Sequence, residues 1–168
     1  MIIALFDITP KYVYIIENAK YNVDMNESTY YQKKIMIVDD DPDILISLQE
    51  LFEKQGFEVT TVNNGRKCLL ELEKGFQGII ILDLMMPVLD GIGTIKQMIT
   101  EGFTINNTII VLTAKPILQR DEFNEIFPYI HEYIIKPFDI NELVQTIKII
   151  AQQPPQKRSL KVKIALTF

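Results

Sequence analysis

The sequence has no tryptophan, one cysteine and one histidine among its 168 residues. The single cysteine, Cys68, excludes an internal disulfide, and its leucine neighbours indicate a buried apolar side chain in a reducing compartment. The single histidine, His131, excludes a multi-histidine metal site, and we expect it at the surface just before a short apolar run at 133–135. A functional site built from several side chains must therefore rely on other residue types.

Long apolar runs and excess positive charge are also missing. The N-terminal stretch MIIALFDITPKYVYII is interrupted by Asp7, Pro10 and Lys11, so it lacks the roughly 20 apolar residues of a membrane span and the basic start of a signal peptide. The net charge of −5 argues against a surface for nucleic acid, which needs clustered Lys and Arg. We expect a cytoplasmic protein without membrane insertion and without direct contact with nucleic acid.

Short apolar runs alternate with segments of helical period between Lys34 and Gln152, a pattern that predicts βα units on a parallel sheet. Four runs are continuously apolar and predict strands buried on both faces, whereas the alternating second run predicts an edge strand. The predicted strands are 35–38, 58–62, 78–82, 108–112 and 133–135. The first predicted helix begins at Pro42, and the second and third cover 65–74 and 91–101. The fourth lies within 117–127, and the fifth runs from Ile140 to before Pro154.

Polar residues collect where the predicted strands end. Asp39 and Asp40 follow the first strand, Asp83 the third, Thr113 the fourth and Lys136 the fifth. The carboxyl ends of parallel strands share one edge of the sheet, so these side chains should converge there. Three converging carboxylates call for a cation, and all-oxygen ligation suits Mg²⁺, with Mn²⁺ as a substitute. A lysine and a hydroxyl beside them suit the oxygens of a transferring phosphoryl group, which makes Asp83 the candidate nucleophile.

Four motifs occur in order at the ends of four of these strands: IMIVDDDPDI, IIILDLMMPVLDG, IIVLTA and YIIKPF. With them, residues 33–152 resemble the receiver domain of a two-component response regulator. The resemblance implies a flavodoxin-like, doubly wound (βα)5 sandwich with strand order 2-1-3-4-5. It also implies a stand-alone phosphorelay protein that takes a phosphoryl group from a sensor histidine kinase or phosphotransfer protein. Such a protein changes its surface for a protein partner and is not a turnover enzyme.

The resemblance assigns roles in a metal site. Asp83 becomes the phosphoacceptor and a metal ligand. Asp40 becomes a direct ligand of Mg²⁺, Asp39 a ligand acting through water, and Met85 supplies its backbone carbonyl.

It also assigns roles in phosphate binding and switching. Thr113 and the backbone N–H of Ala114 hold phosphoryl oxygens, and Lys136 pairs with the phosphate. Tyr133 is the switch aromatic, whose ring moves inward when Thr113 is drawn toward the phosphate. The Lys136-Pro137 peptide is expected to be cis.

Several neighbouring residues have simpler interpretations. Asp41, directly before Pro42, is expected to cap a helix rather than bind metal, and Asp90, before a glycine, is expected to serve a turn or cap. Asp139 and Glu142 form a capping-box-like pair. Without the resemblance, the favoured interpretation of Tyr133 is a core aromatic on a strand. The side chains of Met85 and Met86 are expected to fill gaps in the packing.

Three parts of the chain depart from the resemblance. The stretch IFPYIHEY stands where family members usually have a small, glycine-containing turn, so the output face cannot be assigned from it. Residues 1–32 are an N-terminal extension, of which 1–24 is expected to be spurious or dispensable because Met25 begins an ordinary lead into the first strand. Residues 153–168 form a proline-rich linker and a short basic tail.

Two other functions remain open at this stage. A haloacid-dehalogenase-type phosphohydrolase also places an Asp-x-Asp motif after an apolar strand, which makes Asp39 the nucleophile in place of Asp83. It leaves DLMMPVLDG unexplained and lacks the further acidic motif that this family has downstream of its lysine. A pseudo-receiver, a binding module that works without phosphorylation, is the second, although every residue that the chemistry needs is present.

Overall fold

The computed structural model describes residues 33–114 and 121–152. The strands are β1 (Lys34–Val38), β2 (Glu58–Val62), β3 (Ile79–Leu82), β4 (Thr108–Thr113) and β5 (Ile130–Ile135). The helices are α1 (Pro42–Lys54), α2 (Gly65–Glu73), α3 (Gly91–Thr100), α4 (Asp121–Ile126) and α5 (Ile140–Ala151), with short 3-10 turns η1 (Phe103–Ile105) and η2 (Phe127–Tyr129). No helix within these described ranges is long and apolar enough to cross a membrane.

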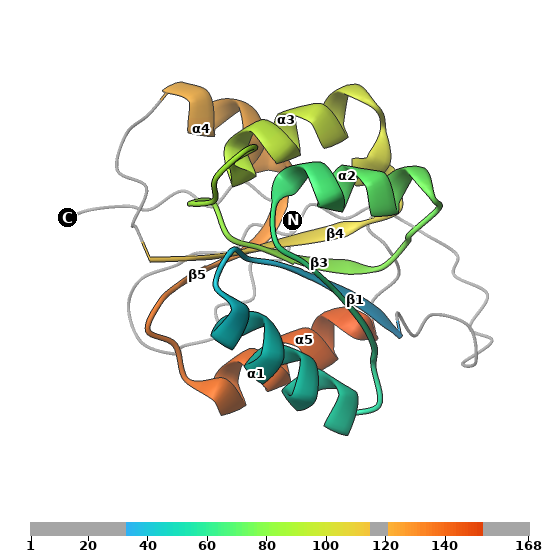
Figure 1. The fold of residues 1–168 in the computed structure, drawn as a ribbon, viewed down its shortest axis with the longest axis vertical. Coiled ribbons are helices and arrows are strands. Elements are labelled where there is room, and N and C mark those ends of the chain that lie inside the picture. Colours follow the sequence, from blue (N-terminus) through green and yellow to red (C-terminus); the bar gives the residue numbers. More distant parts are fainter. Residues whose placement is uncertain (1–32, 115–120, 153–168) are drawn as a thin grey trace, which may run out of the picture.

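The five strands form one parallel sheet in the order β2-β1-β3-β4-β5. Helices α2, α3 and α4 cover one face of the sheet, and α1 and α5 cover the other (Figure 1). This arrangement confirms the predicted doubly wound (βα)5 fold, its strand order and the edge position of the second strand. The point where the order reverses lies between β1 and β3, which is where ligands bind in such sheets.

Side chains alternate between two apolar cores because successive residues of a strand point to opposite faces. On β1, Met36 and Val38 enter the core under α2 and α3, while Ile35 and Ile37 enter the core under α1 and α5. The buried runs of β3 and β4 do the same. The sheet is thus anchored from both faces and can serve as a rigid support for the residues at its edge.

The predicted helix caps are confirmed. Asp41 accepts a hydrogen bond from the N–H of Asp43 (2.9 Å), and Asp90 accepts one from the N–H of Gly93 (2.7 Å). Asp139 accepts from the N–H groups of Asn141 (2.8 Å) and Glu142 (3.0 Å) at the start of α5. Each carboxylate satisfies donors that the first helical turn leaves unpaired, so each helix begins where the sequence predicts.

The last strand differs from its prediction, because it lies at an edge of the sheet and is only partly buried rather than buried on both faces. It begins at Ile130, not at 133, and His131 lies within it as its second residue rather than on the surface before it. The pairing with β4 contains a bulge: Ile109 pairs with Ile130, but Ile110 pairs with Glu132, so β5 carries one extra residue. The other strand bounds, and those of α2 and α3, agree with the prediction to within one residue. The predicted fourth helix is present as α4, and residues 115–120 of its predicted range lie outside the described residues.

Candidate functional site

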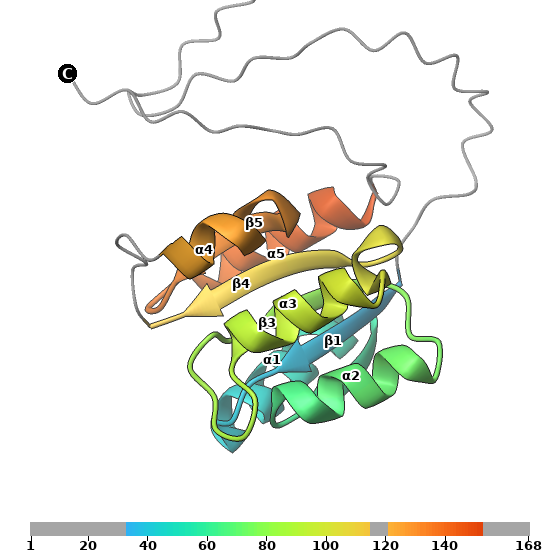
Figure 2. The ribbon, with the colours of Figure 1, turned by 90° about the horizontal axis from the view of Figure 1, so that it is seen from above.

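Three carboxylates meet at the edge where the parallel strands end. Figure 2 shows the arrowheads of β1 and β4 pointing to the same edge of the sheet. Asp39 and Asp40 follow β1, Asp83 follows β3, and carboxylate oxygens from the three residues lie within 4.8 Å of one another. Asp39 and Asp83 are 3% and 6% exposed, whereas Asp40 is open to solvent. The topology therefore assembles the acidic cluster that the sequence predicts.

Lys136, directly after β5, bridges the two buried carboxylates. Its Nζ lies 2.6 Å from Oδ2 of Asp39 and 3.1 Å from Oδ2 of Asp83. Its backbone N–H donates to the carbonyl of Thr113 (2.8 Å), which fixes the lysine beside the end of β4. The ammonium group thus compensates part of the negative charge brought together from β1 and β3.

The other oxygen of each buried carboxylate is held by backbone. Oδ1 of Asp39 accepts a hydrogen bond from the N–H of Asp41 (2.9 Å), and Oδ1 of Asp83 accepts one from the N–H of Met85 (3.0 Å). Each side chain is therefore fixed at both oxygens, one by the lysine and one by the loop that follows its strand. A reactive carboxylate mounted in this way is oriented before any ligand arrives.

Burial and hydrogen bonding oppose each other in the electrostatics of the cluster, and burial prevails at Asp39. Burial raises the pKa of Asp39, although the hydrogen bonds from Lys136 and Asp41 act in the opposite direction. Burial alone lowers the pKa of Lys136, but its hydrogen bonds to Asp39 and Asp83 outweigh this and the pKa is raised, so the ammonium stays charged. Three carboxylates thus face one ammonium, and the remaining negative charge suits a divalent cation. The donors are all oxygen, the set that Mg²⁺ prefers.

Thr113 adds an unusual polar group at the same edge. It is 1% exposed, and its Oγ1 has no hydrogen-bond partner among the residues that the structure describes. A buried hydroxyl without a partner costs free energy, so its retention at the end of β4 needs a reason. A ligand with oxygen acceptors at this edge would supply one. Ala114, the next residue, is exposed.

The loop between Asp83 and α3 is tightly built. The N–H of Leu89 donates to the carbonyl of Pro87 (2.9 Å), and Val88 between them has φ = +71°, so the three residues form a γ-turn. Gly91 begins α3 against the end of β3, where an added Cβ would lie 2.4 Å from the carbonyl oxygen of Asp83. Only glycine permits this close approach between the start of α3 and the backbone at Asp83.

The comparison with known proteins now identifies the family. A model of the response regulator receiver domain matches residues 35–148. The chain belongs to this family. Its receiver domain is 33% identical over 124 residues to the alkaline phosphatase synthesis transcriptional regulatory protein PhoP of Bacillus subtilis, covering 72% of this chain and 49% of PhoP. It is 34% identical over 130 residues to the response regulator SaeR of Staphylococcus epidermidis, covering 77% of this chain and 55% of SaeR.

Solved receiver structures agree with the fold. A CheY-like receiver domain protein from Methanospirillum hungatei superposes with a TM-score of 0.63 at 33% identity, covering 70% of this chain and 93% of that one. The response regulator TrrA of Thermotoga maritima, in complex with Mg²⁺ and BeF, superposes with a TM-score of 0.60 at 30% identity, covering 70% and 98%. The chain spans about half the length of the curated relatives PhoP and SaeR, so their complete activities do not transfer to this receiver domain.

The structure brings together most of the predicted site residues of the receiver domain. The acidic cluster, Lys136 and Thr113 share one edge, and the Lys136-Pro137 peptide is cis as expected. The prediction that Met85 fills a gap is wrong, because its side chain is 51% exposed, whereas Met86 is buried. Sequence reasoning paired Lys136 with phosphate alone and missed its bridge between two carboxylates. That bridge depends on how three loops are placed, for which the sequence carries no local signal.

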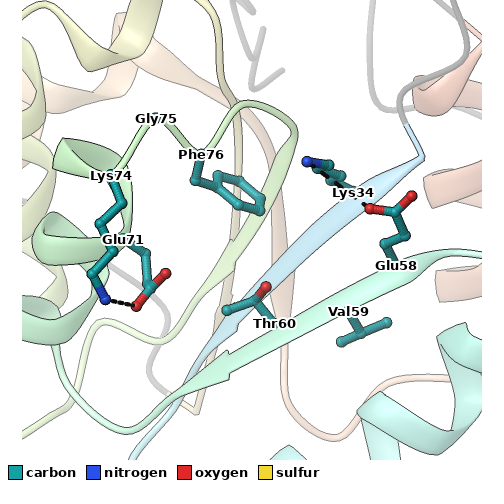
Figure 3. Close-up of a pocket in the computed structure, with 8 residues that line it drawn as sticks. All are labelled: Lys34, Glu58, Val59, Thr60, Glu71, Lys74, Gly75 and Phe76. Carbon is teal, nitrogen blue, oxygen red and sulfur yellow. Dashed lines mark hydrogen bonds and ion pairs between the residues drawn. The ribbon is translucent and has the colours of Figure 1, made fainter.

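A hollow with a volume of about 400 Å³ lies at the opposite edge of the sheet, where the strands begin (Figure 3). Its charged side chains are paired with each other: Lys34 lies 3.9 Å from Glu58, and Lys74 lies 2.8 Å from Glu71. The remaining lining comes from Val59, Thr60, Gly75 and Phe76. Because its lysines and glutamates compensate one another, the hollow presents no excess charge to a ligand, and we assign it no function.

Proposed function

We propose that this receiver domain accepts a phosphoryl group on Asp83 from a sensor histidine kinase or phosphotransfer protein and then presents an altered surface to a protein partner. The single observation that carries the proposal is the setting of Asp83, a buried carboxylate at the end of β3 with one oxygen held by Lys136 and the other by the N–H of Met85. We place this activity in the cytoplasm and expect the receiver domain itself not to contact nucleic acid directly.

The proposed transfer is a simple displacement at phosphorus. A carboxylate oxygen of Asp83 attacks the phosphorus of a phosphohistidine, the P–N bond breaks, and the imidazole leaves as the acyl phosphate forms. Lys136 compensates the charge on the phosphoryl oxygens, while the Thr113 hydroxyl and the Ala114 N–H donate hydrogen bonds to them. Water later attacks the same phosphorus, which releases inorganic phosphate and restores the carboxylate. The domain thereby assists reactions of its own side chain and does not turn over a separate substrate.

A divalent cation, Mg²⁺ or Mn²⁺ in its place, fits the acidic cluster. Asp40 and Asp83 would bind it directly, Asp39 through water, and Met85 through its backbone carbonyl. The bound cation would compensate negative charge that Lys136 alone leaves uncompensated. The excess of carboxylates over ammonium groups supports this assignment, and the TrrA complex with Mg²⁺ and BeF is consistent with it.

The proposed response couples Thr113 to Tyr133. When the Thr113 hydroxyl moves to a phosphoryl oxygen, the Tyr133 ring moves inward, and the surface formed by α4 and β5 changes. The unpartnered Oγ1 of Thr113 supports this role, since a phosphoryl oxygen would provide the missing acceptor.

Intact-mass measurement after incubation with acetyl phosphate and Mg²⁺ tests the proposal. We expect the wild type to gain one phosphoryl group, and this gain to require the cation and to disappear in Asp83→Ala. A gain that persists in Asp83→Ala but is lost in Asp39→Ala would instead support the phosphohydrolase reaction. Absence of any gain in the folded wild type would support a pseudo-receiver and contradict phosphoryl transfer.

A further inference from the structure

Two aromatic contacts connect α4, η2 and β5 next to the proposed switch residue. The ring centroids of Phe123 and Tyr133 lie 5.9 Å apart at an interplanar angle of 77°, an edge-to-face pair. Phe123 also contacts Phe127, with centroids 5.4 Å apart and planes at 57°. Phe123 and Tyr133 are half-buried and pack on the core under α2 and α3, whereas Phe127 is 39% exposed. Phe123 therefore links Tyr133 on β5 to the exposed Phe127 of η2.

The bulge in β5 is what brings Tyr133 to this face. With the extra residue, Tyr133 pairs with Val111, whose side chain enters the core under α2 and α3. Without it, Glu132 would pair with Val111, and Tyr133 would point to the face covered by α1 and α5. The same face continues along β4 from Val111 to Thr113, so the tyrosine ring and the unpartnered hydroxyl lie on one side of the sheet.

We infer that Phe123 is a positioning residue for phosphorylation of Asp83. Its edge-to-face contact holds the Tyr133 ring in the arrangement of the unphosphorylated chain and so lowers the population of the switched state. This inference rests on the proposed function, because it requires that Tyr133 moves toward Thr113 when Asp83 carries a phosphoryl group. The contact is lost in that movement, so it stabilises only the starting state.

The size of the effect follows from the contact that is removed. An aromatic pair contributes enough beyond its buried area to change an equilibrium about 2- to 10-fold. If the switched state is a minor population, removing the Phe123 ring raises that population by the same factor. Phosphorylation that proceeds through the switched state becomes faster to the same extent, without any change in the residues that touch the phosphoryl group.

The test measures the initial rate of Asp83 labelling by acetyl phosphate and Mg²⁺ in folded variants, with thermal unfolding as the check of folding. We expect Phe123→Leu to label about 2- to 10-fold faster than the wild type and Phe123→Tyr, which keeps the ring, to label at the wild-type rate. Phe76→Leu is the matched control, because Phe76 packs on the same core but lies at the hollow on the opposite edge. It should leave the rate unchanged.

A Tyr133→Leu background separates positioning from general loosening of the fold. If Phe123 acts through the tyrosine, Phe123→Leu should no longer accelerate labelling in this background. The same acceleration in both backgrounds, or no acceleration in the otherwise wild-type chain, would overturn the inference while leaving phosphoryl transfer intact. Failure of the wild type to label would be a different result, since it would overturn the proposed function itself.

Discussion

At the scale of single residues, Val88 has the least favourable backbone conformation. It has φ = +71°, the one positive value at a non-glycine position in the part of the chain that the structure describes, and it is β-branched and 86% exposed. A β-branched residue with positive φ destabilises the folded state by about 1–2 kcal/mol, and glycine removes this strain. Glycine also has more conformational freedom in the unfolded chain, which offsets part of the stabilisation. We expect Val88→Gly to raise the free energy of unfolding by about 1 kcal/mol, measured by urea denaturation.

Val88→Ala is the matched control for this substitution. It removes most of the exposed apolar side chain but keeps the Cβ that the positive φ disfavours. If alanine stabilises the protein as much as glycine, the gain comes from the surface and not from the backbone.

Asp39 leads to a second prediction at this scale, because its buried negative charge would help to bind a cation but destabilises the folded protein when no cation is present. Burial raises its pKa in the folded state, so its contribution to stability is present at low pH and is lost as the pH rises through the folded-state pKa. In chelator, Asp39→Asn should therefore be most stable relative to the wild type near neutral pH, and this relative advantage should shrink on acidification.

Denaturant unfolding at several pH values between about 3 and 7 checks the Asp39 prediction. Asp43→Asn serves as the control, since Asp43 is exposed at the start of α1 and lies outside the acidic cluster. An advantage of Asp39→Asn that stays constant with pH would contradict the electrostatic explanation.

At the scale of elements, the caps can be tested through α5. Asp139 accepts two backbone hydrogen bonds at the start of this helix, and replacement of such a cap by alanine typically costs about 1 kcal/mol. We expect Asp139→Ala to lower the free energy of unfolding by that amount. Gln145→Ala, at an exposed position in the same helix, should have little effect. Equal losses in both variants would contradict the capping explanation, because alanine at position 145 removes no cap and raises helix propensity.

The elements also show where sequence reasoning succeeds and where it stops. Strands β1, β3 and β4 are predictable because they are buried on both faces, so their apolar runs are continuous. The start of β5 is not predictable in this way. This strand lies at the edge of the sheet, His131 and Glu132 interrupt its apolar pattern, and its bulge shifts the alternation of side chains by one residue. The contact of Tyr133 with Phe123 depends on that bulge and is hidden from the sequence for the same reason.

At the scale of the whole molecule, topology predicts which residues meet but not how they pair. Parallel strands with a reversal of order between β1 and β3 must bring Asp39, Asp40 and Asp83 to one edge, so the cluster follows from strand order alone. The bridge from Lys136 to both buried carboxylates depends on the loops after β1, β3 and β5 together. The sheet thus fixes the positions of the three carboxylates, and the loops determine which of them are paired with Lys136 and which stay available to a cation.

Because Lys136 compensates only part of the negative charge of the three carboxylates, we expect cation binding to affect the stability of the entire domain. A cation that binds the folded state and not the unfolded chain stabilises the fold by RT ln(1 + [L]/Kd), about 2.7 kcal/mol at a concentration 100 times Kd. We expect Mg²⁺ to raise the thermal midpoint of the wild type. Asp40 is exposed and is not bridged by Lys136, so Asp40→Asn should leave the midpoint in chelator almost unchanged and remove most of the rise with Mg²⁺.

Asp41→Asn, at the neighbouring helix cap, keeps a capping side chain and should retain the full rise. A rise that survives in Asp40→Asn would place the cation away from the acidic cluster, because that carboxylate is the one that the lysine leaves uncompensated.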